Sequence, residues 1–119
     1  MRLLVVAAVA AGAFALVGAP AAQAGEDIPW TWNSEDHDVE ARFASFGEWL
    51  YAKEYNDPGY VDWYHGDSGS HRWWVPGNGN GNRQDNNLSL SEGKTFAMKV
   101  CQHHTAWPDD CSGWKYGVS

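Results

Sequence analysis

From residue 42 onward the chain alternates short apolar runs with clusters of Gly, Asn, Asp and Pro. Runs rich in aromatic and β-branched residues, bounded by turn formers, are typical of the strands of an all-β sandwich or barrel. A weak helical stripe over 39–51 leaves a short helix there as an alternative. We therefore predict an all-β fold, a small antiparallel β-sandwich. The pattern places its strands at residues 42–46, 48–55, 60–65, 71–75, 88–90, 94–102 and 114–118.

The longest of these segments, 94–102, has the clearest two-residue alternation of apolar side chains. Successive side chains of a strand point to opposite faces of the sheet, so every second residue of this segment is predicted to face the core. Two leucines of the preceding segment have the same spacing. The predicted core positions are Phe96, Met98, Val100, Leu88 and Leu90.

The first 24 residues have the pattern of a signal peptide. Arg2 supplies the positive charge, residues 3–17 are uncharged and apolar, and Ala22-Gln23-Ala24 forms a small-x-small cleavage site. An uncleaved membrane anchor is the alternative, but the apolar run is shorter than the roughly 20 residues that span a bilayer. The sequence therefore predicts a secreted, extracellular protein. Its mature chain would begin at Gly25 and form one domain.

Residues 25–40 differ from the rest of the mature chain. They are rich in acidic residues, hold no Lys or Arg, and have the composition of an extended arm in front of the domain at 41–119. Within this arm Ile28, Trp30 and Trp32 alternate, with Pro29 between them. An extended segment places alternate side chains on one side, which is how strand addition fills pockets of a partner protein. We predict partner binding by these four residues, and the alternative is that the arm packs on its own domain.

The overall charge narrows the range of partners. The formal net charge is −7, with 15 acidic against 8 basic residues. Such a chain does not attract a nucleic-acid backbone or an anionic membrane by charge, so neither is expected as a partner. The aromatic side chains have three possible roles: core packing, a protein interface or stacking on sugars. The candidates for sugar stacking are Tyr60, Trp63, Tyr64, Trp73 and Trp74.

Cys101 and Cys111 are the only two cysteines. Export places them in an oxidising compartment, so they are predicted to form a disulfide between the last strands, with two free thiols as the alternative.

No catalytic, metal-binding or cofactor-binding group is predicted. Gly66-Asp67-Ser68-Gly69 has the letters of a serine protease nucleophile, but a single short domain lacks the two-barrel fold that supplies its His and Asp, so a hairpin turn is expected. Five histidines are present, without the spacing of a metal site. Residues 76–87 resemble a calcium loop in composition only, since they contain one carboxylate, and we expect a flexible loop. Asn87-Leu88-Ser89 is formally a glycosylation sequon.

Several short motifs in 41–119 together resemble a family of small exported actinobacterial proteins. They are residues 46–48 (FGE), 56–59 (NDPG), 87–94 (NLSLSEGK), 99–101 (KVC) and 111–114 (CSGW). The best-understood members with this pattern look like the adapter (B) subunits of umbrella toxin particles, which are secreted antibacterial assemblies.

The resemblance implies a non-enzymatic adapter. It would link a repeat-bearing toxin stalk to a lectin-bearing subunit, and its N-terminal segment would dock into the latter. The two alternatives are an extracellular glycan-binding module and a free-standing antimicrobial toxin. The acidic composition disfavours a toxin that disrupts membranes, because such toxins usually carry positive charge.

Overall fold

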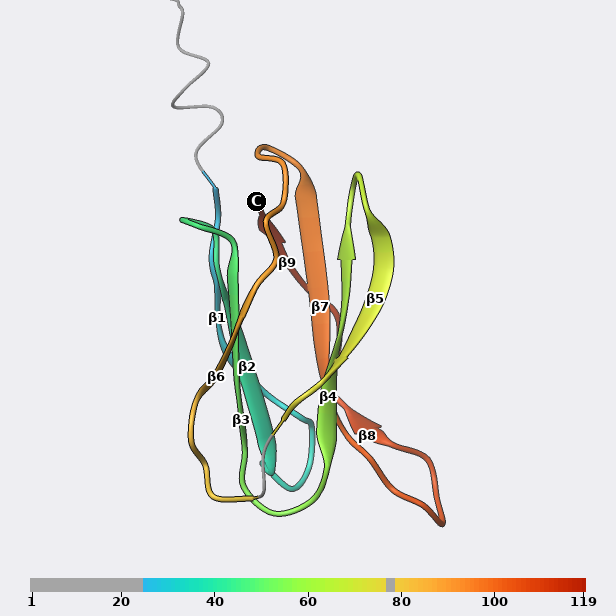
Figure 1. Cartoon of the computed structure of the whole chain (residues 1–119). Helices are drawn as coiled ribbons and strands as arrows, with labels where there is room; N and C mark the ends of the chain where they lie inside the picture. The colour runs from blue at the N-terminus through green and yellow to red at the C-terminus, as the bar shows by residue number, and fades with distance from the viewer. Residues whose placement is uncertain (1–24, 77–78) are drawn as a thin grey trace, which may run out of the picture.

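The computed structural model describes residues 25–76 and 79–119, so the predicted signal peptide lies outside the described residues. Two antiparallel sheets pack face to face (Figure 1). One sheet has the order β1 (Ile28–Trp32), β2 (Val39–Ala44), β3 (Trp49–Glu54) and β6 (Gln84–Asn87). The other has the order β5 (Gly69–Trp74), β4 (Gly59–His65) and β7 (Thr95–Gln102), and both β8 (Asp110–Cys111) and β9 (Lys115–Val118) pair with β7.

The predicted all-β sandwich is confirmed. The described part of the chain contains no helix, and residues 39–51, where a short helix was the alternative, form the β2–β3 hairpin and its turn. No helix in these residues is long and apolar enough to cross a membrane.

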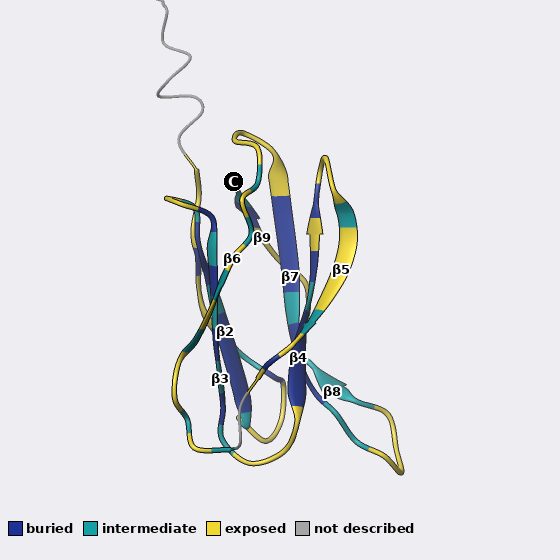
Figure 2. Ribbon diagram, in the orientation of Figure 1, coloured by how far each residue is buried: buried dark blue, intermediate teal, exposed yellow. Residues whose placement is uncertain are grey.

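The core lies between the sheets, where the facing sides of β2, β4 and β7 are buried (Figure 2). The predicted alternation in β7 is confirmed, because Phe96, Met98 and Val100 are all fully buried. Phe96 stacks on Phe43 of the other sheet with ring centroids 3.9 Å apart. Aromatic pairs of this kind add about 0.5–1.5 kcal/mol beyond the area that they bury.

The strand predicted at 88–90 is not formed, and β6 lies just before it at Gln84–Asn87. β6 pairs with β3 through backbone hydrogen bonds, and all four of its side chains are polar. A search for apolar alternation in the sequence therefore could not detect this strand. Leu88 and Leu90 are partly buried and do pack against the core from the connection to β7. The loop expected at 76–87 is therefore only partly a loop.

Residues 25–40 do not form a segment separate from the domain. β1 pairs antiparallel with β2, and β2 itself begins at Val39. The boundary expected at residue 41 therefore does not divide an arm from the sandwich. Of the two alternatives for this extended segment, packing on its own domain is the arrangement that the structure shows.

A β-bulge in β1 changes which of its side chains share a face. Ile28 pairs with Phe43 and Thr31 with Ala41, so β1 uses one residue more than β2 over this interval. An extra residue reverses the alternation of a strand. As a result Ile28 is buried in the core with 2% of its surface exposed. The expectation that Ile28 and the two tryptophans lie on one side is therefore wrong.

The predicted disulfide is confirmed. Cys101 and Cys111 lie directly opposite each other in the β7–β8 pair, with Cα atoms 4.0 Å apart. The bridge fixes β8, a strand of only two residues, to the edge of the second sheet. The loop between the strands, residues 103–109, projects from one end of the sandwich (Figure 1).

Replacing both cysteines by serine should lower the stability of the domain. Closing a short loop stabilises by roughly 2–3 kcal/mol in the chain-entropy model. We expect the melting temperature, followed by circular dichroism, to fall by at least several degrees. A reductant should produce the same fall in the wild type and no change in the double variant. Equal melting curves with and without reductant would contradict a stabilising role of the bridge.

The turn between β2 and β3 contains a buried carboxylate. Glu48 has a left-handed φ of 53° and is 8% exposed, and its Oε2 atom has no hydrogen-bond partner. Burial raises the pKa of Glu48 above its ordinary value of 4.5. The nearby Glu92 carboxylate raises this pKa further, and His65 partly offsets the rise.

A raised pKa means that the folded chain holds this proton more tightly than the unfolded chain, so stability falls as pH rises from the unfolded to the folded pKa. Glu48→Gln keeps the shape of the side chain and removes its charge. It should raise the melting temperature at pH 7, and the gain should vanish near about pH 4, where Glu48 is largely protonated. A gain of equal size at both pH values would show that charge is not the cause.

Candidate protein-binding site

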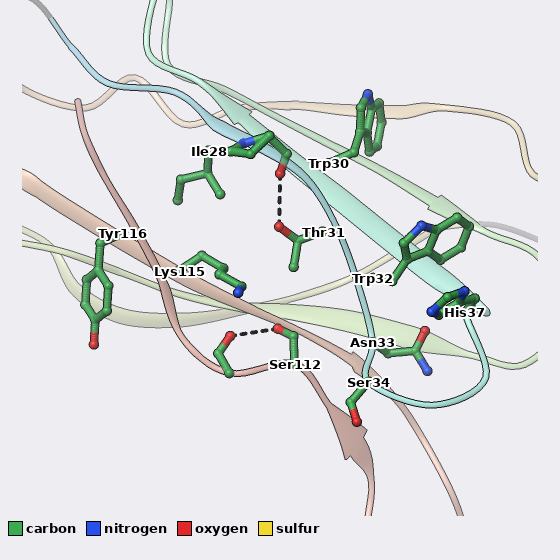
Figure 3. Close-up of a pocket in the computed structure, with 12 residues that line it drawn as sticks. Ile28, Trp30, Thr31, Trp32, Asn33, Ser34, His37, Ser112, Lys115 and Tyr116 are labelled. Atoms are coloured by element: carbon green, nitrogen blue, oxygen red, sulfur yellow. Dashed lines mark hydrogen bonds between the residues drawn. The ribbon is translucent and has the colours of Figure 1, made fainter.

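A groove opens between β1 and β9, the strands at neighbouring edges of the two sheets (Figure 3). At one end Glu26 and Val118 join the sheets by two backbone hydrogen bonds of 2.9 and 3.0 Å. Beyond this bridge the two edges separate and enclose a volume of about 580 Å³. One wall is formed by residues 28–34 with His37, and the other by Ser112, Gly113, Lys115 and Tyr116.

Beyond the other end of the groove, Asp110 of β8 connects the β1–β2 loop to the second sheet. This carboxylate accepts hydrogen bonds from the β1–β2 loop, with the Asn33 Nδ2 atom at 2.7 Å and the Glu35 N–H at 2.8 Å. Ser34 and the Asp36 N–H are further donors. Burial of the carboxylate opposes its ionisation, but these hydrogen bonds outweigh that effect and lower the pKa of Asp110 below its ordinary value of 3.8. The groove is thus held between two fixed points.

Lys115 carries the only uncommitted Lys or Arg charge in residues 25–76 and 79–119. It lies opposite Met98, on the inner side of β9, and extends into the groove between Thr31 and Ser112 (Figure 3). Every other lysine and arginine of these residues has a carboxylate or an aromatic ring against it. Those side chains are Arg42, Lys53, Arg72, Arg83, Lys94 and Lys99.

Trp30 and Trp32 lie on the outer face of the first sheet, next to the groove. Trp30 is 37% exposed, and the Lys53 ammonium lies 4.7 Å from its ring centroid. Trp32 is half-buried and stacks on His37 with centroids 5.0 Å apart, and Tyr55 lies against its ring. These contacts hold both indole rings in place, so little further ordering is needed when a partner covers them.

The structure therefore brings together three of the four predicted partner-binding residues. Pro29 is exposed and lines the groove together with the two tryptophans. Ile28 lies at the inner end of the groove and packs against Gly117. A Cβ atom added to Gly117 would lie only 3.0 Å from the Cγ1 atom of Ile28. The sequence analysis missed Ser112, Lys115 and Tyr116, because nothing in the pattern indicates which strand lies next to β1.

The Gly66–Gly69 segment forms the exposed turn between β4 and β5. The Nε2 atom of His71 bonds to the backbone carbonyl of Ser68, at 2.9 Å. His65 accepts the Asp67 N–H at Nδ1, so its Nε2 carries the proton and donates to Ser119. The two histidines therefore use these nitrogens for structural hydrogen bonds. In the described residues no group of three or more His, Cys, Asp or Glu side chains is arranged to hold a metal ion.

Comparison with known proteins gives no match to a family model, a curated protein or a solved structure. The class of protein that the fold and site define is a small disulfide-bonded β-sandwich with an open groove between two strand edges.

Asp110→Asn tests the connection of the β1–β2 loop to the second sheet. Because the folded pKa of Asp110 is lowered, its hydrogen bonds stabilise fully above the unfolded pKa, and this stability is lost as pH falls through the folded pKa. The variant should unfold about 4–8 °C lower at pH 7, as a loss of about 1 kcal/mol predicts. The difference from the wild type should shrink as pH falls below about 3. A constant difference from pH 7 down to about pH 2 would mean that ionisation of Asp110 does not matter.

Proposed function

We propose that this protein is a non-enzymatic adapter that binds other secreted subunits of an antibacterial toxin complex similar to umbrella toxin particles. In such a complex it would link a repeat-bearing stalk to a lectin-bearing subunit. The resemblance of residues 41–119 to adapter subunits and the signal-peptide pattern support this proposal. The observation that carries it is the groove between β1 and β9, with its two strand edges and one uncommitted cation.

The edges of the groove favour an extended partner segment. Within the described residues β1 pairs only with β2, and β9 pairs only with β7 apart from the single Glu26–Val118 bridge. Backbone groups on the facing sides of β1 and β9 are therefore open to an added strand, which gains affinity from main-chain hydrogen bonds. Natural proteins seldom leave a strand edge without protection unless it has a use.

The charge and the aromatic side chains define the chemistry of the partner. An acidic side chain on the added strand would complement the positive charge of Lys115. Trp30 and Pro29, exposed beside the edge, offer apolar contact of the kind that carries most binding energy at interfaces. The partner is thus an extended segment that carries at least one carboxylate and apolar residues.

Two variants test this role without disturbing the core. Trp30→Ala with Trp32→Ala should weaken partner binding at least about tenfold, since 1.4 kcal/mol already corresponds to that factor. Lys115→Glu should weaken it similarly by charge repulsion. Deleting residues 25–40 is not a clean test, because it removes Ile28 from the core.

The measurement is the recovery of partner proteins, identified by mass spectrometry, with tagged protein from the supernatant of its own producing culture. Lys94→Glu is the matched control, because this substitution makes the same change of charge at an exposed residue outside the groove. We expect repeat-bearing and lectin-bearing proteins with the wild type and with the control, and their loss in both test variants. Recovery of the wild type as a free monomer, or equal recovery by all variants, would refute the adapter role.

A further inference from the structure

The outer face of the second sheet carries a second group of exposed aromatic side chains, of which only Tyr116 also lines the groove. β4 and β9 lie on either side of β7, and Tyr64 of β4 and Tyr116 of β9 project outward from them. Trp114 immediately precedes β9. Their exposed fractions are 40%, 69% and 43%. The rings surround a depression of about 250 Å³ that is lined otherwise by the small side chains of Ser70 and Ala97.

A second depression of about 430 Å³ adjoins the first and shares Ser70 and Trp114 with it. Its lining combines the aromatic residues Trp63 and Trp114 with the polar side chains of Asp62, His71 and Arg72. Concave sites of this size that combine aromatic walls with a few fixed polar groups are typical of small-ligand binding, whereas protein interfaces are broader.

The polar groups of the second depression are held rigidly. The Arg72 guanidinium donates two hydrogen bonds to the Asp62 carboxylate, at 2.7 and 3.0 Å, and lies 3.9 Å from the ring centroid of Tyr60. A bidentate pair of this kind has fixed geometry. Its unused N–H groups and oxygen lone pairs can still bind hydroxyl groups of a ligand.

Charge complementarity points to a neutral ligand. Arg72 is neutralised by Asp62, and the Lys99 ammonium lies over the Trp114 ring at 5.3 Å from its centroid. The face thus offers hydrogen-bonding groups with a single net positive charge, that of Lys99, on a chain whose formal net charge is −7. A polyanion would meet the negative field of the whole protein, and an uncharged ligand would not.

Sugar rings have both properties that this face requires. The C–H groups on one side of a pyranose form an apolar surface that stacks on aromatic rings, and its hydroxyl groups donate and accept hydrogen bonds around the rim. We propose that the outer face of the second sheet binds a neutral polysaccharide, with Trp114 between two successive sugar units in the two depressions. Tyr64 and Tyr116 stack on one unit, and the Arg72–Asp62 pair hydrogen-bonds the next.

This proposal rests on the outer face of the second sheet, whereas the groove lies along the β9 edge of that sheet, and it does not depend on the adapter role. Tyr116 lines both sites, so Trp114, which lines only the two depressions, separates the two roles. Of the aromatic residues considered from sequence for sugar contact, Tyr64 lines the first depression and Trp63 lines the second. Trp63 is 8% exposed and belongs to the core, and Trp73 packs against it. Trp74 is exposed, but it lies outside both depressions.

Affinity electrophoresis of the mature protein tests the proposal. The gels contain neutral polysaccharides, namely β-glucans, α-glucans, mannans and soluble chitin derivatives, with polygalacturonate as the anionic comparison. We expect retardation by at least one neutral polymer and none by polygalacturonate. Trp114→Ala should weaken this retardation at least about tenfold, and Tyr116→Ala should weaken it measurably.

Trp107→Ala is the matched control, because Trp107 is 64% exposed on the β7–β8 loop and lines neither depression. It should bind as the wild type does, and melting curves of all variants should establish that they are folded. No retardation of the wild type by any neutral polymer would overturn the proposal. So would equal binding by Trp114→Ala, an equal loss in Trp107→Ala, or retardation by polygalacturonate alone. Loss of partner protein by Trp114→Ala without any polysaccharide binding would make this face a protein interface instead.

Discussion

The stacking of Phe43 on Phe96 joins the two sheets inside the sandwich. Each ring comes from an inner strand of its sheet, and both are fully buried. Trp63 extends the stack from β4, with its ring centroid 5.8 Å from that of Phe96. A domain of this size buries a smaller share of its surface than larger domains do, so few residues hold it together. The outer faces and the edges keep their present positions only as long as this central contact aligns the sheets.

The bulge in β1 connects this core with the surface. Before the bulge Ile28 points inward and fills the space beside Gly117, and after it Trp30 and Trp32 point outward. One extra residue therefore lets a five-residue strand seal the core and also present two indole rings. Without it, the alternation would place both tryptophans on the same face as Ile28. The groove, the core and the aromatic surface thus depend on the same irregularity.

Much of the fold could be predicted because clusters of turn-forming residues separate the strands and the side chains of β7 alternate strongly. β7 was predicted to within one residue. β6 escaped prediction because its pairing with β3 depends on backbone hydrogen bonds and its side chains are all polar.

The candidate site could be predicted only in part, for a related reason. Composition identified Trp30 and Trp32, but the residues of the opposite wall of the groove lie at least 80 positions later in the chain. Neither a bulge nor the order of strands in a sheet leaves a local signal in the sequence, because both depend on long-range pairing. Lys115 stands out only in the structure, because each other Lys and Arg of the described residues contacts a carboxylate or an aromatic ring and Lys115 contacts neither.

The bridge between Glu26 and Val118 joins two residues that are 92 positions apart, near the beginning and the end of the described chain. A chain that emerges N-terminus first can form the β2–β3 hairpin early, but β1 lacks its contact with β9 until the last residues have emerged. Until then the inner side of β1, including Ile28, faces solvent. The groove therefore takes shape only when the whole sandwich is complete, so a nascent or truncated chain would not yet display this docking edge in its final form.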